Sequence, residues 1–224
     1  MARIFLLIFL TGCATAQAQS NSLSYPKVFI EYGSSLDLQI CPSGISEAVL
    51  KEAAYKVPQL QQLWGKNEKD LLGTATLVTG KSFRRKEETV STLICPNLKG
   101  QAEPILIPMW PYMSTTTQGR PFDQKFFIGV TFHELLHRYI DEILGGMMPS
   151  TPLLQKYSNE NLLVRRHLHV DAVQKAVYLK LGRGDEINAI IANDSKFFGP
   201  DYARAWDIVN RLEGSEPFLK ELRR

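Results

Sequence analysis

The sequence predicts an α+β protein, with a mixed N-terminal half over residues 19–121 and a helical C-terminal half over residues 122–224. Three runs in the first half, KVFIEY, ETVSTLIC and PILIPMW, are rich in the β-branched and aromatic residues typical of strands. Elsewhere apolar residues recur with a spacing near 3.6, which indicates helices. About 205 residues of ordinary globular composition can bury one core, so we expect a single domain over residues 19–224.

The elements of the first half follow in order along the chain. A strand is predicted over Lys27–Tyr32. Two helices are predicted over Ile45–Val57 and Pro58–Val78, and a second strand over Glu88–Cys95. A third strand is predicted over Pro104–Trp110, and its prolines place it at a sheet edge or against a turn.

The second half follows a loop at STTTQGRP and is predicted to be helical. Helices fit four segments: Phe122–Leu144, Ser158–Leu181, Asp185–Ala192 and Asp201–Leu212. Gly145 and Gly182 lie where C-terminal caps are expected. All 4 histidines of the chain lie in this half, so we expect it to carry any histidine-based metal site.

Residues 1–18 have the layout of a secretory signal peptide, with a positive charge at Arg3, the apolar run Ile4–Leu10 and small residues after it. The apolar run is too short to span a bilayer. The tripeptide ending at Ala18 fits cleavage before Gln19, whereas the tetrapeptide ending at Cys13 resembles a bacterial lipobox. We expect an exported protein, periplasmic or secreted, that is attached to a membrane only if Cys13 carries a lipid.

The two remaining cysteines, Cys41 and Cys95, each lie in an Ile-Cys-Pro triplet, and neither has metal-ligand spacing. An even pair in an oxidising compartment predicts a disulfide, with two buried free thiols as the alternative. Such a bridge would stabilise the fold by about 4 kcal/mol in the chain-entropy model. Removing residues 1–18 takes away only the charge of Arg3, so the formal charge falls from +3 to +2, too little to indicate a nucleic-acid partner.

The segment TFHELLHRYI contains the pattern His-Glu-x-x-His, formed by His133, Glu134 and His137. On a helix, residues four apart project from one face, so both imidazoles can reach one cation. Glu134 is offset by about 100° from His133, which suits a group beside the metal. This pattern is typical of two zinc ligands with a general base. The alternative is a buried amphipathic helix that happens to contain histidines.

Catalytic zinc usually has three protein ligands and an open position. On the next predicted helix, Glu160, His167 and Asp171 fall in one stripe with Gln174 and Tyr178, whereas His169 lies on the opposite, apolar side. We expect His167 to be the third ligand, with Glu160 and His169 as alternatives. His169 is interpreted as a core histidine.

With these residues the chain resembles the gluzincin branch of zincin metallopeptidases over about 55 residues, Phe122 to Tyr178. In that branch the second motif is glutamate-x-x-x-aspartate, and its glutamate binds zinc while its aspartate hydrogen-bonds a zinc-bound histidine. The matching positions are His167 and Asp171, so a histidine replaces the usual glutamate. The resemblance implies a zincin-like fold, a Zn²⁺ cofactor and a peptide or protein substrate.

The predicted function is a secreted zinc-dependent peptidase in which Glu134 takes the proton of a zinc-activated water. We expect a tyrosine to stabilise the oxyanion, with Tyr202, Tyr178 and Tyr157 as candidates. Zincins pair substrate with an edge strand before the first zinc helix, and Pro104–Trp110 has that place in the order, with a plain core strand as the alternative. Two other functions stay open: hydrolysis of a non-peptide or cell-wall amide, and a non-catalytic binding or structural role.

Overall fold

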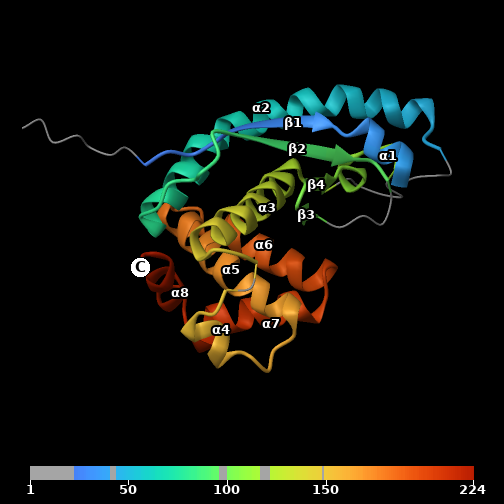
Figure 1. Cartoon of the computed structure of the whole chain (residues 1–224). Helices are drawn as coiled ribbons and strands as arrows, with labels where there is room; N and C mark the ends of the chain where they lie inside the picture. The colour runs from blue at the N-terminus through green and yellow to red at the C-terminus, as the bar shows by residue number, and fades with distance from the viewer. Residues whose placement is uncertain (1–22, 41–43, 96–99, 117–121, 148) are drawn as a thin grey trace, which may run out of the picture.

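A four-stranded mixed sheet forms the framework of the N-terminal half (Figure 1). The computed structural model describes residues 23–40, 44–95, 100–116, 122–147 and 149–224. The strands are β1 (Lys27–Tyr32), β2 (Glu87–Leu93), β3 (Gln101–Ala102) and β4 (Ile105–Pro108). Their order is β1-β2-β4-β3, and only β3 runs antiparallel to its neighbour. The mixed α/β character predicted from sequence is therefore observed.

The first two predicted strands are confirmed, because β1 has the predicted bounds and β2 begins one residue early and ends two residues early. Val28 and Ile30 of β1 are buried while the intervening Phe29 is 45% exposed, which is the alternation expected of a strand with one covered face. Ile30 pairs with Val90 of β2 in the parallel register, so the apolar face continues across both strands.

The third predicted strand, Pro104–Trp110, is shorter than expected and lies elsewhere in the sheet. It forms β4 and then a 3₁₀ turn, η1 (Trp110–Tyr112). An edge position is excluded, because β4 pairs with β2 on one side and with β3 on the other. The predicted alternative, a strand against a turn, is observed. Pro104 follows a cis peptide bond in the β3–β4 turn, and Pro108 ends the strand, so neither proline interrupts its middle. The edge strand is β3.

The two helices predicted on either side of Pro58 are one helix, α2 (Glu47–Thr79). Ser46 caps its first turn and Gly80, with φ 70°, ends it in the left-handed conformation. Pro58 removes one helical hydrogen bond, at a cost of about 3 kcal/mol. Helix α2 nevertheless continues because residues on both sides of the proline, including Ala53 and Leu60, are buried in the same core.

Helix α2 also satisfies the outer backbone groups of β1. The Glu68 carboxylate accepts hydrogen bonds from the Val28 amide, at 2.7 Å, and from the Trp64 indole, at 3.2 Å. Gln61 accepts from the Ile30 amide and donates to the Val28 carbonyl. These side chains cover an edge that would otherwise present unpaired backbone groups, so α2 and the sheet form one unit.

Helices dominate the rest of the chain, as predicted. Their bounds are α1 (Ser34–Ile40), α3 (Gln124–Leu144), α4 (Pro152–Lys156), α5 (Leu162–Lys180), α6 (Gly184–Phe197), α7 (Pro200–Asp207), the π-helical turn η2 (Ile208–Leu212) and α8 (Glu216–Leu222). The predicted helix from Ser158 begins only at Leu162, because Asn161 caps it. The predicted helix Asp201–Leu212 is divided into α7 and η2. The short helices α1, α4 and α8 were not predicted.

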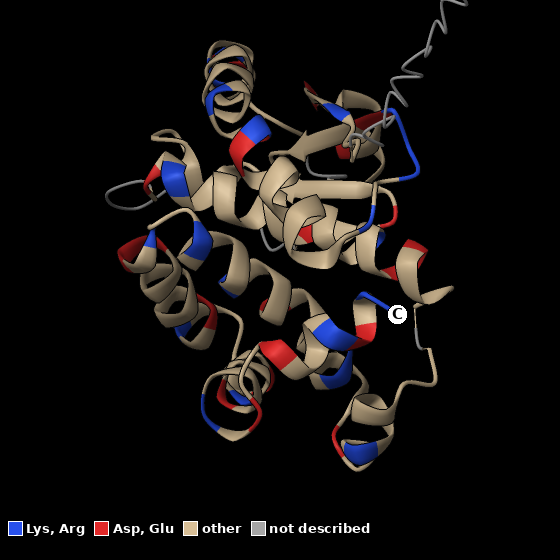
Figure 2. Cartoon of the chain, turned by 90° about the vertical axis from the view of Figure 1, so that its left-hand side faces the viewer, with Lys and Arg blue, Asp and Glu red and all other residues tan. Residues whose placement is uncertain are grey.

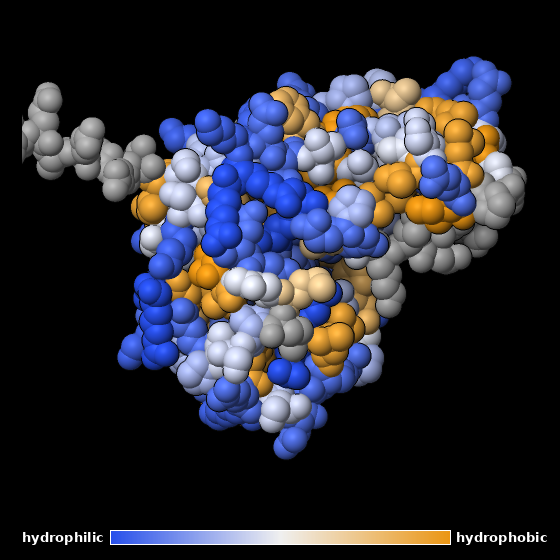
Figure 3. Space-filling view, viewed as in Figure 1, coloured by the Kyte–Doolittle hydropathy of each residue, from blue (hydrophilic) through white to orange (hydrophobic). Residues whose placement is uncertain are grey.

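Helix α2 runs alongside β1 (Figure 1) and also contacts α3 and α5, and the other C-terminal helices pack around α5. One core cluster joins residues of both halves, from Val28 in β1 to Leu222 in α8. Acidic and basic residues are interspersed along the helices in Figure 2. Apolar side chains gather at the end near α1 and the start of α2 (Figure 3), where Leu38 and Tyr55 are exposed.

Three predictions concern export and the cysteines. Residues 1–18 and Cys41 lie outside the described residues, so the signal peptide, the processing site and the Cys41–Cys95 pairing stay predictions. Cys95 itself is buried and disulfide-bonded. Among the described helices, none is both long and apolar enough to cross a membrane.

Candidate metal centre

Helix α3 presents His133 and His137 on one face, one turn apart, as their spacing requires. Asp123 caps the helix at its start, and Gly145 ends it with φ 81°. Both imidazoles are buried, and their Nε2 atoms lie 3.2 Å apart. Two nitrogens bound at about 2.0–2.1 Å to one tetrahedral zinc would lie about 3.3–3.4 Å apart. The observed spacing therefore fits a shared ion.

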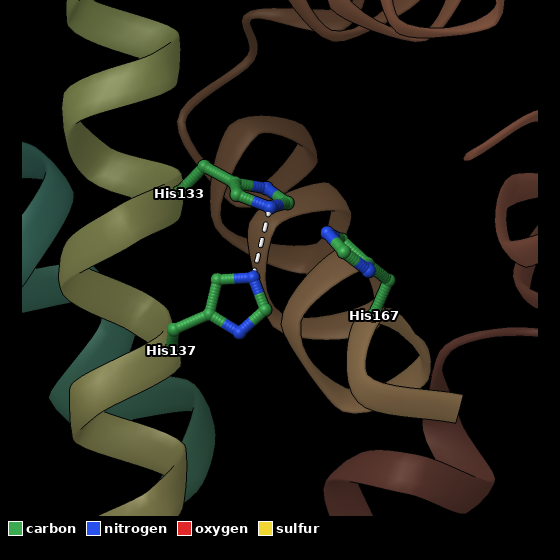
Figure 4. A group of neighbouring side chains, drawn as sticks. All are labelled: His133, His137 and His167. Carbon is green, nitrogen blue, oxygen red and sulfur yellow. Dashed lines mark hydrogen bonds between the residues drawn. The ribbon is translucent and has the colours of Figure 1, made fainter. Parts of the chain in front are cut away.

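Helix α5 adds His167 from the opposite side of the site (Figure 4). One nitrogen from each of the three histidines lies within 4.8 Å of the other two. The His167 ring stacks on His133 with centroids 5.1 Å apart and meets His137 edge-on at 4.8 Å. An inward shift of His167 on the order of 1 Å would complete a three-imidazole site.

Hydrogen bonds hold two of these rings in the tautomer that a metal requires. His133 donates from Nδ1 to the Gln174 side-chain oxygen at 2.9 Å, and the Gln174 amide donates to the Gly129 carbonyl at 3.1 Å. His167 donates from Nδ1 to the Leu163 carbonyl at 2.6 Å. In both rings the lone pair is therefore on Nε2, the nitrogen that can bind a cation. The Nε2 of His133 faces the Nε2 of His137.

Gln174, and not Asp171, makes the hydrogen bond to His133. The resemblance to gluzincins gave that role to Asp171, but its carboxylate lies 4.0 Å from the His133 Nδ1. Asp171 is fully buried, and neither of its oxygens has a hydrogen-bond partner among the described residues. Burial and the nearby charge of Asp194 raise its pKa well above the usual value. Asp171 therefore lies beside His133 without orienting its ring.

The other two candidates for a third ligand lie elsewhere. His169 points away from the cluster and donates from Nε2 to the Glu221 carboxylate of α8 at 2.8 Å, with Phe218 against its ring. Glu160 precedes α5 and pairs with Arg204 at 2.7 Å. His167 is the candidate that the fold brings to the histidine pair.

Burial gives all three histidines of the cluster a low pKa. Desolvation lowers the pKa of His133 to about 4 and that of His167 to about 3. It also lowers the pKa of His137, and the charges of His133, His167 and Arg166 add to the effect. The rings are therefore neutral at pH values near 7, which is the form that binds metal.

Glu134 is buried beside the cluster. Burial raises its pKa to about 8, the Arg166 charge opposes this rise, and the Asp194 charge adds to it. A bound cation would lower this pKa toward the ionised form. Gly100, just before β3, covers the Glu134 carboxylate so closely that a β-carbon at this position would overlap it. Gly100 therefore leaves room for the carboxylate at the entrance of the site.

The cluster opens into a cleft of about 480 Å³. Its walls come from β3, from α3 and from the start of α5, and they include Glu134, His137 and His167. Arg138, next to His137, fixes β3 there by donating to the Ala102 carbonyl and to Glu103. The edge strand near the histidines is therefore β3, and not the predicted Pro104–Trp110.

The three candidate tyrosines occupy different places. Tyr202 of α7 lines the cleft, and its ring centroid is 4.4 Å from that of His167. Tyr178 packs on Phe132 in the core. Tyr157 donates to Glu213 at 2.5 Å. Of these three, only Tyr202 can reach a molecule bound at the histidine cluster.

Comparison of the chain with known protein families, with curated proteins and with solved structures found no match. The sequence pattern identified the three histidines and Glu134 but assigned no role to Gln174, although it lay in the predicted stripe. Gly100, Asp194 and Arg138 were missed as well. Their roles depend on contacts between α3 and segments at least 34 residues away, for which the sequence contains no local signal.

Proposed function

We propose that the protein is an exported zinc-dependent peptidase with a single zincin-like domain over residues 19–224. One observation supports this most strongly: three neutral imidazoles converge beside a buried glutamate at the wall of a cleft. A structural zinc site is usually closed by four protein ligands, whereas a catalytic site keeps one position open. The three histidines here leave the direction of the cleft open.

The residues of the chain have distinct parts in the proposed reaction. Zinc, when bound by His133, His137 and His167, would supply an acidified water and polarise the scissile carbonyl. Glu134 takes a proton during attack and gives it to the leaving amine. Gln174 and the Leu163 carbonyl keep two of the rings oriented.

Two further parts of the cleft suit a peptide substrate. The hydroxyl of Tyr202 is the candidate donor to the developing oxyanion, because its ring lies against His167 at the cleft. The outermost strand, β3, can align an extended substrate by backbone hydrogen bonds. The relationship to the gluzincins is part of the proposal, with His167 in place of the usual glutamate.

The test is Glu134→Gln, which preserves the shape of the side chain and removes the base. We expect the variant to keep zinc and to lose hydrolysis by roughly 10²–10⁴-fold. Glu142→Gln is the matched control, because Glu142 lies on the same helix but hydrogen-bonds the Arg84 amide. Wild-type turnover by Glu134→Gln would contradict the mechanism.

Metal analysis and assays on different substrates separate the other two functions. A zinc-loaded protein that cleaves peptidoglycan fragments but no peptide of a broad library would be an amidase of the cell wall. A folded protein that binds no zinc would favour the non-catalytic role.

A further inference from the structure

The cleft contains a cation without an acidic partner. Arg166, the residue before His167, lines the cleft with the histidines and Glu134 and is partly buried. Among the described residues its guanidinium has no ion pair within 4.0 Å and no hydrogen bond. The segments outside the described residues contain no aspartate or glutamate. No acid of the chain therefore neutralises Arg166 by direct contact.

Two other arginines near the cleft, Arg138 and Arg204, have acidic partners, unlike Arg166. Arg138 pairs with Glu88 and with Glu103. Arg204, behind Tyr202, pairs with Glu160 and with Asp207. An arginine presents five donors in a fork that matches a carboxylate. Because the described residues leave that fork without an acceptor beside the cleft, it suits an acceptor on a bound molecule.

The acidic groups around Arg166 do not supply that acceptor. Glu103 faces the same cleft but is held by Arg138, at 2.8 Å. Asp141 is near enough for the Arg166 charge to oppose the burial that raises its pKa, yet it lies beyond ion-pair distance. Glu134 is the remaining acid, and it belongs to the catalytic group. With a divalent cation bound, the cleft would therefore carry net positive charge.

We propose that Arg166 binds a carboxylate of the substrate, so that the cleft prefers peptides with an anionic group next to the scissile bond. This preference deepens, and rests on, the proposed peptidase function. The exposed Met147 and Leu163 also line the cleft and form an apolar wall beside the cation. A free C-terminal carboxylate and an acidic side chain share the recognised chemistry.

The experiment measures dissociation constants for matched peptides on metal-free and on zinc-loaded Glu134→Gln protein. One pair differs only in a C-terminal carboxylate or amide, and a second pair differs only in glutamate or glutamine at successive internal positions. In one of the two pairs, protein that keeps Arg166 should bind the peptide with the carboxylate roughly 10- to 100-fold more tightly than its neutral counterpart. This is the gain expected for a hydrogen-bonded charge pair. The pair that shows this preference identifies the source of the carboxylate.

Arg166→Ala should abolish that preference, and Arg166→Lys should keep part of it. Lys180→Ala is the matched control: it removes one charge from the same helix, about 21 Å farther along the axis, and should change nothing. Equal binding of all pairs, or a preference that survives Arg166→Ala, overturns the inference. If the carboxylate preference is found but the protein with its native Glu134 hydrolyses no peptide, the proposed peptidase function is rejected and the anion site is retained.

Discussion

Helix α5 carries two buried histidines, His167 and His169, whose surroundings differ completely. On one face His167 meets two other neutral imidazoles and donates to a backbone carbonyl. On the other face His169 contacts the Glu221 carboxylate and the Phe218 ring. Burial alone therefore does not make a histidine a candidate ligand. The neighbours decide, because His167 lies beside two further imidazole nitrogens with which it can share an ion.

The largest expected effect on folding lies on the His169 side. Glu221→Ala should lower the free energy of unfolding by about 1–3 kcal/mol, because it leaves the buried His169 ring and the Leu153 amide without their acceptor. Urea denaturation at a fixed pH measures this loss. The double change His169→Leu with Glu221→Leu should cost less than the sum of the two single leucine changes. A fully additive result would show that the two side chains do not act as a pair.

On the His167 side the expected effect is on metal affinity. Gln174→Leu should weaken zinc binding by about 10- to 100-fold, because His133 loses the acceptor that orients it. Asp171→Asn, the neighbouring change, should have the smaller effect, since Asp171 makes no hydrogen bond to the ring. Competition with a chelator measures both constants. The reverse order would give the orienting role to Asp171.

The smallest expected effect is a pH dependence of the metal-free protein. The unfolded chain binds a proton at His167 below about pH 6.5, whereas the folded protein binds it only below about pH 3, because burial lowers the pKa to about 3. The folded state therefore loses stability through this ring as pH falls, by up to about 1.4 kcal/mol per pH unit.

Glu134 has the opposite sign over part of this range, because its raised pKa favours the folded state at low pH. The measurement therefore compares wild type with His167→Leu by urea denaturation at about pH 7 and about pH 5. We expect the variant to gain stability relative to wild type at the lower pH. An unchanged difference would mean that His167 is protonated alike in both states.

The parts of the fold that follow from local patterns were predictable. The strand at Lys27–Tyr32 alternates in burial, and the helix that carries His133 and His137 has a cap at Asp123 and a glycine at its end. The helix break at Pro58 was predicted wrongly, because the core on both sides of the proline outweighs a local penalty.

The rest depends on contacts between distant segments. The sheet order places β4 inside the sheet, although its prolines favoured an edge or a turn. The choice of Gln174 over Asp171 as partner of His133 depends on how α5 packs against α3. Two residues on one helical stripe cannot be ranked from spacing alone.

The central claim is that His133, His137 and His167 form a metal centre from which His169 is excluded. Zinc titration of the wild type, His167→Ala and His169→Ala, followed by metal analysis, tests this most directly. We predict one zinc per wild-type chain, severe loss of zinc in His167→Ala, and a retained zinc in His169→Ala, because three imidazoles hold the ion far better than two. Loss of zinc from His169→Ala with retention in His167→Ala would contradict the account.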